Sequence, residues 1–330
     1  MPEILHNKRL IRPVIVTDKT VEKAIAPYLP KAFLTDNPLV YFKGNCTFEE
    51  IDRLCDILAP YDSIITFVGG QLIDTVKVVS DKLNIFLINI QTLPSNCAAL
   101  TSKSIIYASS THEKIANKRQ QKPVDMVLIE PELLRRAPKA YIVSGIGDTL
   151  AKYYEIRRRL TLDKTIHVTA AIGRFYIETC RKITLSLEDF NEISDIEWHN
   201  ALDTIFLVAA SVDGIADQDG RSVGAYAFHN AYVKVIEGRR PTHGEIVALG
   251  SLFQILLEDL QESRELALEI DQFYKKIGLP RNFKELGTIT DDQLLEMASL
   301  LVDRKDSRMQ SVFPDISLDR VTSVLMQLRE

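Results

Sequence analysis

The chain has 330 residues, of which 46% are apolar, and a formal net charge of −5. This length is typical of about two domains, and the apolar share allows a large buried core. Acidic and basic residues are interspersed, which excludes the clustered positive charge of a nucleic-acid-binding surface. No apolar run approaches the length of a membrane span, and the first residues lack the apolar region of a signal peptide. Four scattered cysteines without a CxxC motif favour a reducing compartment, so we expect a cytoplasmic protein.

Short apolar strands alternate with helices in the first 140 residues. Thr47 followed by Glu50 forms a capping box, which marks the start of one of these helices. Such alternation predicts an α/β domain with a mostly parallel sheet, which binds ligands at the carboxyl ends of its strands. The predicted strands are 12–18, 38–42, 63–68, 84–90 and 126–130, and the predicted helices are 20–29, 47–58 and 71–83.

The strand signal fades after about residue 141, and broad apolar faces recur at helical spacing. We expect an α/β domain at 1–141 and an all-α domain at 142–330, with a boundary near Pro138. A cleft between the two is the expected active site. The predicted helices of the second domain lie within 165–185, 201–215, 220–235, 244–260, 291–302 and 317–330.

Two features of the first domain are candidate ligand contacts. Gly69 and Gly70 lie between a strand and a helix, where the backbone can approach a phosphate, although a tight turn alone also explains them. Asp18 ends the first strand. It can accept hydrogen bonds from a ribose and repel a 2′-phosphate, or it can cap the next helix.

The second domain offers candidate metal ligands. His229 and His243 are fourteen positions apart in helix-forming sequence, and Asp148 either caps a helix or binds a metal ion. A lone helical histidine is usually structural, so the pattern leaves these roles open. We assign no role to His6, His112, His167 and His199.

Several segments occur together and in order in one known family. They are VIVTDKTVEKA, GNCTFEEIDRL, VGGQLIDTVK, TLPSNCAALTSKSIIY, VLIEPELLRRAPKAYIVSGIGDTLAKYYE, DGRSVGAYAFHNAYV, THGEIVALG and LPRNFKELG. On these segments the chain resembles the iron-containing alcohol dehydrogenase and glycerol dehydrogenase superfamily, which shares its fold with dehydroquinate synthase. The glycerol dehydrogenase branch is the most similar.

The resemblance implies a Rossmann-like domain that binds NAD(P) and a helical domain that holds one divalent metal ion, zinc or iron. It places Asp18 on the ribose, which favours NAD over NADP, and His229 beside the reaction as a catalytic residue. Asp148 and His243 fall on metal-ligand positions, and Cys97 falls on a substrate-contacting position. The remaining implied cofactor contacts are Gly69, Gly70, Gln71, Thr92, Ser95, Thr101 and Tyr107.

The chain departs from the family pattern at several of these positions. Thr66 and Val68 stand where the family usually has glycine, and Cys97 replaces an aspartate, which makes glycerol a poor choice of substrate. Tyr226 occupies the position of the third metal ligand, and a neutral phenol binds zinc or iron poorly. Three interpretations stay open: His229 substitutes, Tyr226 binds as a phenolate, or the site binds metal weakly or not at all.

We expect an NAD-dependent, metal-dependent oxidoreductase that transfers hydride between a small alcohol or hydroxy acid and nicotinamide. The alternative is a catalytically degenerate nucleotide-binding member that has lost its metal site. A dehydroquinate-synthase-like lyase is disfavoured, because the phosphate-binding and acid–base residues it needs are not found. The expected partner is a small-molecule substrate, with no nucleic acid or membrane, and the chain is expected to form a homo-oligomer.

Overall fold

The computed structural model describes residues 1–110, 114–162, 167–187, 192–216, 220, 222–238, 241–304 and 307–330. The chain divides into two compact units. The first unit comprises Met1–Pro94 and Ala98–Ala137, and the second comprises Ser95–Cys97 and Pro138–Glu330. The sequence predicted a division after residue 141 and did not predict that Ser95–Cys97 packs with the helical part. His112 lies outside the described residues.

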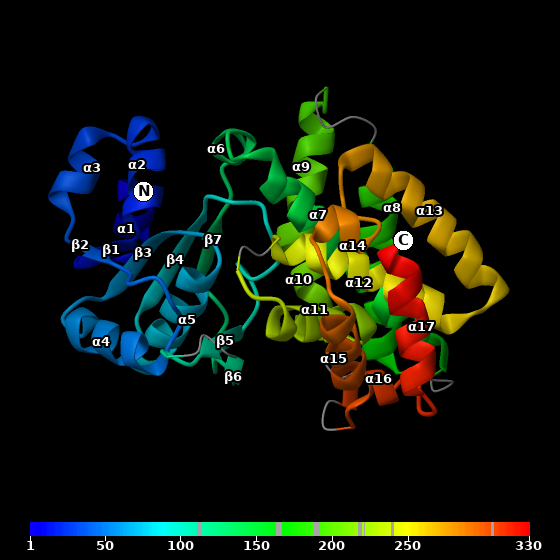
Figure 1. Ribbon diagram of the computed structural model, residues 1–330. Coiled ribbons are helices and arrows are strands. Elements are labelled where there is room, and N and C mark those ends of the chain that lie inside the picture. Colours follow the sequence, from blue (N-terminus) through cyan, green and yellow to red (C-terminus); the bar gives the residue numbers. More distant parts are fainter. Residues whose placement is uncertain are drawn as a thin grey trace. The chain divides into compact units, whose positions relative to one another are not determined.

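A parallel sheet of five strands forms the centre of the first unit (Figure 1). Its order is β2-β1-β3-β4-β7, and each neighbouring pair runs parallel. This sheet confirms the α/β fold class expected from the alternation of strands and helices. The strands are β1 (Pro13–Thr17), β2 (Leu39–Tyr41), β3 (Ser63–Val68), β4 (Phe86–Gln91) and β7 (Met126–Leu128).

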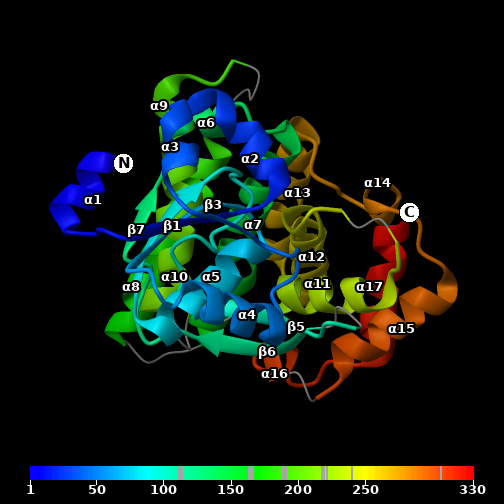
Figure 2. The ribbon, with the colours of Figure 1, turned by 90° about the vertical axis from the view of Figure 1, so that its left-hand side faces the viewer.

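Helices cover both faces of this sheet because side chains alternate along each strand. Val14 and Val16 pack into one apolar cluster with α4 and α5, whereas Ile15 packs into the other with α2 and α3. Figure 2 shows α4 and α5 on one side of the sheet and α2 and α3 on the other. The helices are α1 (Pro2–Lys8), α2 (Lys19–Ile25), η1 (Ala26–Tyr28), α3 (Lys31–Asp36), α4 (Phe48–Leu58), α5 (Gln71–Leu83) and α6 (Pro131–Arg135).

An antiparallel hairpin of β5 (Lys103–Tyr107) and β6 (Lys114–Arg119) was not predicted from the sequence. The side chains of β6 are mostly exposed, so the strand carries no apolar alternation that could reveal it. The hairpin is separate from the parallel sheet.

In the described residues of the second unit, all regular secondary structure is helical, as the sequence predicted. Its central helix α12 is buried along nearly its whole length and packs against α7 and α11 (Figure 1). None of the described helices is both long and apolar enough to cross a membrane. The helices are α7 (Lys139–Leu162), α8 (Val168–Leu185), α9 (Asp195–Asp203), the π-helical segment η2 (Thr204–Val208), α10 (Ala209–Ile215), α11 (Gly224–Val235), α12 (His243–Glu258), α13 (Gln261–Ile277), α14 (Phe283–Leu286), α15 (Asp291–Val302), α16 (Ser307–Gln310) and α17 (Leu318–Arg329).

Candidate functional site

Four of the predicted cofactor contacts lie at one edge of the parallel sheet. Asp18 follows β1, Gly69 and Gly70 follow β3, and Thr92 follows β4. Because these strands are adjacent and parallel, their carboxyl ends share an edge. The chain passes from β1 to β2 on one side and then to β3 on the other. This topological switch point is where such sheets bind ligands.

Asp18 caps α2 in the structure. Its Oδ1 accepts hydrogen bonds of 2.8 Å from the backbone N–H groups of Thr20 and Val21. Both bonds use the same carboxylate oxygen, so capping leaves Oδ2 for a ligand hydroxyl. The two roles that the sequence left open for Asp18 are therefore compatible.

Gly70 requires glycine because of its backbone. It is the N-cap of α5, with φ +55° and ψ −126°, a conformation that side-chain-bearing residues avoid. No side chain of the described residues caps α5, so its first N–H groups are suited to a phosphate. Gln71 accepts a hydrogen bond of 2.9 Å from Cys46 N, which fixes the start of the helix.

Thr66 accounts for one departure from the family's glycine pattern. Its hydroxyl is buried and donates a hydrogen bond of 2.8 Å to the carbonyl of Val16 on the neighbouring strand. The threonine therefore stabilises the pairing of β3 with β1. It lies inside the strand, and the turn itself keeps Gly69 and Gly70.

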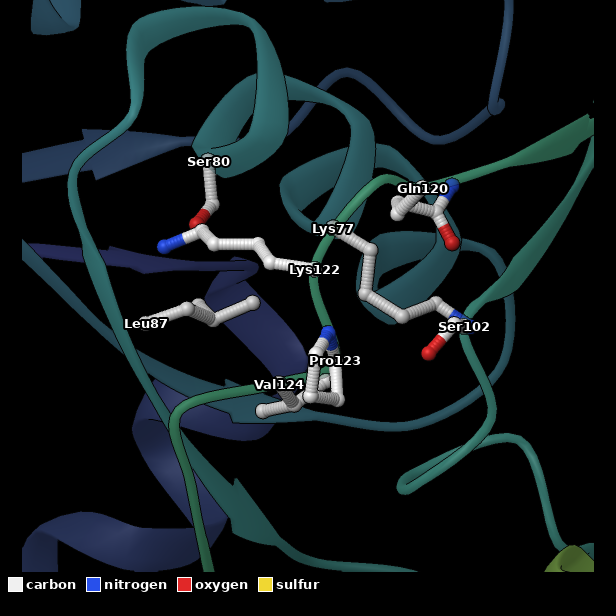
Figure 3. A pocket seen from close by; sticks show the side chains of 8 residues that line it. All are labelled: Lys77, Ser80, Leu87, Ser102, Gln120, Lys122, Pro123 and Val124. Carbon is white, nitrogen blue, oxygen red and sulfur yellow. The ribbon is translucent and has the colours of Figure 1, made fainter. Parts of the chain in front are cut away.

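Thr101 and Tyr107 belong to the hairpin region of the first unit. The buried Lys77 donates hydrogen bonds of 3.1 Å to the carbonyls of Ala98 and Thr101, which fixes this loop. Figure 3 shows Lys77 extending toward Ser102 at one side of a small cavity. The cavity measures about 10 Å³, room for roughly one water molecule. It is therefore too small to be a nucleotide site.

The predicted site residues of the second unit come together where α7 crosses α12. A Cβ added to Gly244 would lie 1.7 Å from the Ser144 carbonyl oxygen, and one added to Gly147 would lie 2.5 Å from the Gly244 oxygen. These glycines let the two helices approach closely. Asp148 follows one of them and His243 precedes the other, so their side chains meet, with His243 Nε2 3.4 Å from Asp148 Oδ1.

Asp148 is a buried carboxylate, only 1% exposed. Its Oδ1 accepts a hydrogen bond of 2.5 Å from the hydroxyl of Tyr226, and its Oδ2 accepts one of 3.4 Å from Cys97 N. Burial would raise its pKa, but the charge of Lys152 and the contacts with His243 and Tyr226 outweigh burial and lower the pKa. Asp148 is therefore ionised at neutral pH.

His229 and His243 contact each other directly. His243 Nδ1 and His229 Nε2 are joined by a hydrogen bond of 2.9 Å, and Tyr226 packs edge-on against His243. Asp148, His243 and His229 thus make a continuous chain of polar contacts. Tyr226, His229 and His243 are partly exposed, whereas Asp148 lies beneath them. We call these four residues and Lys152 the polar cluster.

Lys152 and Glu155 were not singled out in the sequence. They lie one and two helical turns after Asp148 on α7, and all three are at most 1% exposed. Lys152 Nζ lies 3.4 Å from the Tyr226 hydroxyl and 4.9 Å from the centre of its ring. The signal available was the spacing of three charged residues along a helix that is otherwise uncharged from Ile142 to Ile156.

Glu155 positions Tyr226 through the backbone. Its Oε2 accepts hydrogen bonds from the N–H groups of Val223 and Tyr226, at 2.8 and 3.3 Å. The N-cap of α11, Val223, has no capping side chain of its own, so a carboxylate from α7 takes that role. α11 is therefore fixed against α7 at its first turn.

Ser95 and Cys97 join the second unit through two contacts. Ser144 Oγ donates a hydrogen bond of 3.2 Å to the Ser95 carbonyl and accepts one of 3.1 Å from Gly244 N. Cys97 N reaches Asp148 as described above. Cys97, the residue at the predicted substrate position, thus lies beside the polar cluster. Ser95 belongs to the second unit, whereas the other predicted cofactor contacts belong to the first.

The donor atoms of the polar cluster do not converge on one point. The two nitrogens of His243 point in different directions, with Nε2 facing Asp148 and Nδ1 facing His229. The Tyr226 hydroxyl already engages Asp148 Oδ1. Within the described residues, no three His, Cys, Asp or Glu side chains are placed to hold a metal ion. In this arrangement the donor set does not fit a divalent metal ion.

Comparison with known proteins shows what the chain is similar to. Residues 1–131 match the family model for iron-containing alcohol dehydrogenase. Hydroxycarboxylate dehydrogenase A of Escherichia coli (strain K12) is 28% identical over 303 residues, which are 88% of this chain and 82% of that protein. The chain is thus similar in sequence to the iron-containing alcohol dehydrogenase family over its first unit and to a hydroxycarboxylate dehydrogenase over most of its length.

Solved structures of this superfamily have the same fold. Glycerol dehydrogenase from Schizosaccharomyces pombe superposes with a TM-score of 0.81 at 22% identity, covering 99% of this chain and 86% of that one. Sulfoacetaldehyde reductase from Bifidobacterium kashiwanohense, solved in complex with NAD⁺, gives 0.75 at 16% identity, covering 99% and 93%. The resemblance and the fold class inferred from the sequence are both confirmed.

Proposed function

We propose that the protein is a nicotinamide-dependent oxidoreductase that interconverts a small alcohol or hydroxy acid with its carbonyl form. The observation that carries this proposal is the sheet edge where Asp18, Gly70 and Thr92 follow three adjacent parallel strands. Members of the superfamily that resemble the chain are named hydroxycarboxylate and glycerol dehydrogenases. The first unit supplies the nucleotide site, and the second supplies the polar cluster.

We further propose NAD(H) as the cofactor in preference to NADP(H). The free oxygen of Asp18 is suited to accept hydrogen bonds from a ribose, and its charge would repel a 2′-phosphate. The N-terminus of α5 beside Gly70 would receive the pyrophosphate. Gln71, Thr92, Ser95, Thr101 and Tyr107 stay proposed as further cofactor contacts on the resemblance alone.

Oxidation moves a hydride from the carbinol carbon to the nicotinamide ring and the hydroxyl proton to a base, so alcohol and NAD⁺ yield carbonyl, NADH and a proton. The partly exposed residues Tyr226, His229 and His243 are proposed to meet the substrate oxygen. The bond between His243 and His229 supports His229 as the group that takes the proton. Cys97 beside Asp148 gives the substrate pocket a small, weakly polar wall.

The experiment is a pair of measurements on the purified protein. NADH binding is followed by fluorescence, and turnover is followed at the nicotinamide absorbance with a panel of diols, 2-hydroxy acids and their carbonyl forms. We expect NADH binding, weaker binding in Gly70→Ala, and turnover of at least one small substrate. Failure to bind either NADH or NADPH would contradict the proposal.

A second candidate function is nucleotide binding without catalysis. The observation that favours it is the hydrogen bond between Tyr226 and Asp148, which engages a carboxylate that relatives of this superfamily are expected to use for metal. NADH binding together with no turnover across the whole panel would support this candidate. Turnover of any panel substrate that depends on His229 would exclude it.

Assembly and compartment are also proposals. Superfamily resemblance supports a homo-oligomer, and the four cysteines are free thiols, in keeping with a reducing cytoplasm. Light scattering after size-exclusion chromatography would give the number of subunits directly. A mass equal to a single chain at all concentrations would contradict the proposed oligomer.

A further inference from the structure

Lys152 is a cationic side chain enclosed in the second unit, and 1% of it is exposed. Transfer of an isolated ammonium group from water to a protein interior is very unfavourable, so a buried lysine is retained where opposite charge compensates it. The charges that face it from its own helix are Asp148 and Glu155, one turn before and nearly one turn after. The buried thiol of Cys180 on α8 and the phenol of Tyr226 on α11 also lie close.

Lys152 lies close to Asp148, because the Tyr226 hydroxyl is 3.4 Å from Lys152 Nζ and 2.5 Å from Asp148 Oδ1. Burial would raise the pKa of Asp148, and the charge of Lys152 is the largest of the influences that lower this pKa instead. The two side chains share one face of α7 because they are four residues apart. A monovalent cation that belongs to the chain therefore already lies beside the one carboxylate in the polar cluster.

Lys152 also contacts Tyr226, the residue at the position of the third predicted metal ligand. Its Nζ lies 3.4 Å from the phenol oxygen and over the ring at 4.9 Å. An ammonium at this place would repel a dication strongly, because like charges a few ångströms apart in a partly buried site are poorly screened by water. Lys152 and Tyr226 therefore act on the same carboxylate.

We propose that the Lys152 ammonium takes the electrostatic place of a divalent metal ion at Asp148, so that the polar cluster works without one. The claim that the cluster contacts a substrate rests on the proposed function, whereas the claim that it binds no metal ion does not. The chain supplies a fixed cation beneath Tyr226, His229 and His243, which leaves these three side chains to contact a substrate oxygen. Asp148 holds Tyr226 and His243 in position.

The test measures zinc binding by equilibrium dialysis in four proteins: wild type, Tyr226→His, Lys152→Met and Tyr226→His/Lys152→Met. Methionine has about the length of the lysine stem and removes the ammonium group with its charge and its hydrogen-bond donors. We expect no stoichiometric zinc in the wild type or in Tyr226→His, because the ammonium persists in both. The double variant should bind one zinc ion at least about a hundredfold more tightly than Tyr226→His does. It has the same added imidazole but lacks the repelling charge of Lys152.

Two results would overturn the proposal. The first is that the wild-type protein binds one equivalent of zinc and that the Asp148→Asn variant does not. This result would be decisive even if the Lys152 variants failed to fold. The other is stoichiometric zinc in Tyr226→His while Lys152 is present, which would make the histidine alone sufficient. Zinc dialysis is independent of NADH binding, so failure of this inference is distinguishable from failure of the proposed oxidoreductase function.

Discussion

The hydroxyl of Tyr226 donates a hydrogen bond of 2.5 Å to Oδ1 of Asp148, a carboxylate almost wholly removed from water. The bond joins the first turn of α11 to the middle of α7. It also occupies the oxygen that His243 approaches from α12. Tyr226 is therefore a partner of the carboxylate, and this contact underlies our proposal of a site without a metal ion.

Tyr226→Phe should destabilise the second unit. The substitution keeps the ring and removes one donor from a buried carboxylate, which is expected to cost about 1–3 kcal/mol in the free energy of unfolding. Urea unfolding measures this change. The control is Tyr41→Phe, whose hydroxyl donates to Glu22 at the exposed surface, 2.8 Å away, and whose loss should have no measurable effect. Equal changes in the two variants would contradict a buried Tyr226–Asp148 bond.

Gly244→Ala should disrupt the crossing of α7 and α12. The new methyl group would meet the backbone oxygen of Ser144 at 1.7 Å, and backbone cannot rotate away as a side chain can. Overpacking of this kind costs about 1–3 kcal/mol or more, and the helices must separate. The midpoint temperature of thermal unfolding and the NADH-dependent activity should both fall.

The matched control is Gly214→Ala in α10. An added Cβ at Gly214 has no neighbour within 4 Å, so this substitution should be neutral or stabilise the helix by about 0.5–1 kcal/mol. If Gly244→Ala were tolerated as well as Gly214→Ala, the close approach that brings His243 to Asp148 would be wrong.

Asp18→Ser should weaken discrimination against NADP(H). Serine preserves the helix cap, so the fold of α2 is retained while the negative charge is removed. The ratio of the NADPH and NADH dissociation constants, measured by fluorescence titration, should shift about tenfold toward NADPH, since one charge near a phosphate is lost. An unchanged ratio would show that Asp18 is only a cap.

Asp62 should give the protein a specific loss of stability in acid. Burial would raise its pKa, but hydrogen bonds from Ile11 N, Ser63 Oγ and Arg12 N hold the pKa below its ordinary value. A carboxylate with a lowered pKa stabilises the fold above its unfolded pKa of about 3.9, and this contribution is lost as pH falls further.

The control variant for this prediction is Asp62→Asn. Asparagine keeps the shape of the side chain but has no group that titrates in this pH range. Wild type should be the more stable protein at pH 7, and the difference between their unfolding free energies should shrink as pH falls below about 4. Parallel pH profiles for the two proteins would contradict the assignment.

The sequence predicted the parallel sheet because its strands are buried on both faces. Such strands read as runs rich in β-branched residues, as in Val14–Val16 and Ser63–Val68, and the glycines after β3 predict the ligand edge. The hairpin of β5 and β6 was missed because mostly exposed strands have no such run. Pairing of Asp148 with His243 came from the resemblance, since residues so distant in sequence give no local signal of contact.

Lys152 was missed for a different reason. In the stretch Leu150–Glu155, a lysine among helix-forming residues is typical of a solvated face. Only the packing of α7 on all sides shows that this face is buried, and burial is what turns an ordinary lysine into the compensating charge of Asp148. The interpretation of Tyr226 as an isolated departure was incomplete because its partner is on another helix.

The most direct measurement is the turnover of NADH with the best carbonyl substrate before and after exhaustive dialysis against a chelator. Our account predicts the same rate in both samples and no gain when zinc or iron(II) is added back. It also predicts loss of that rate in Lys152→Met with NADH affinity retained. A rate that disappears on chelation and returns with one equivalent of metal ion would contradict it.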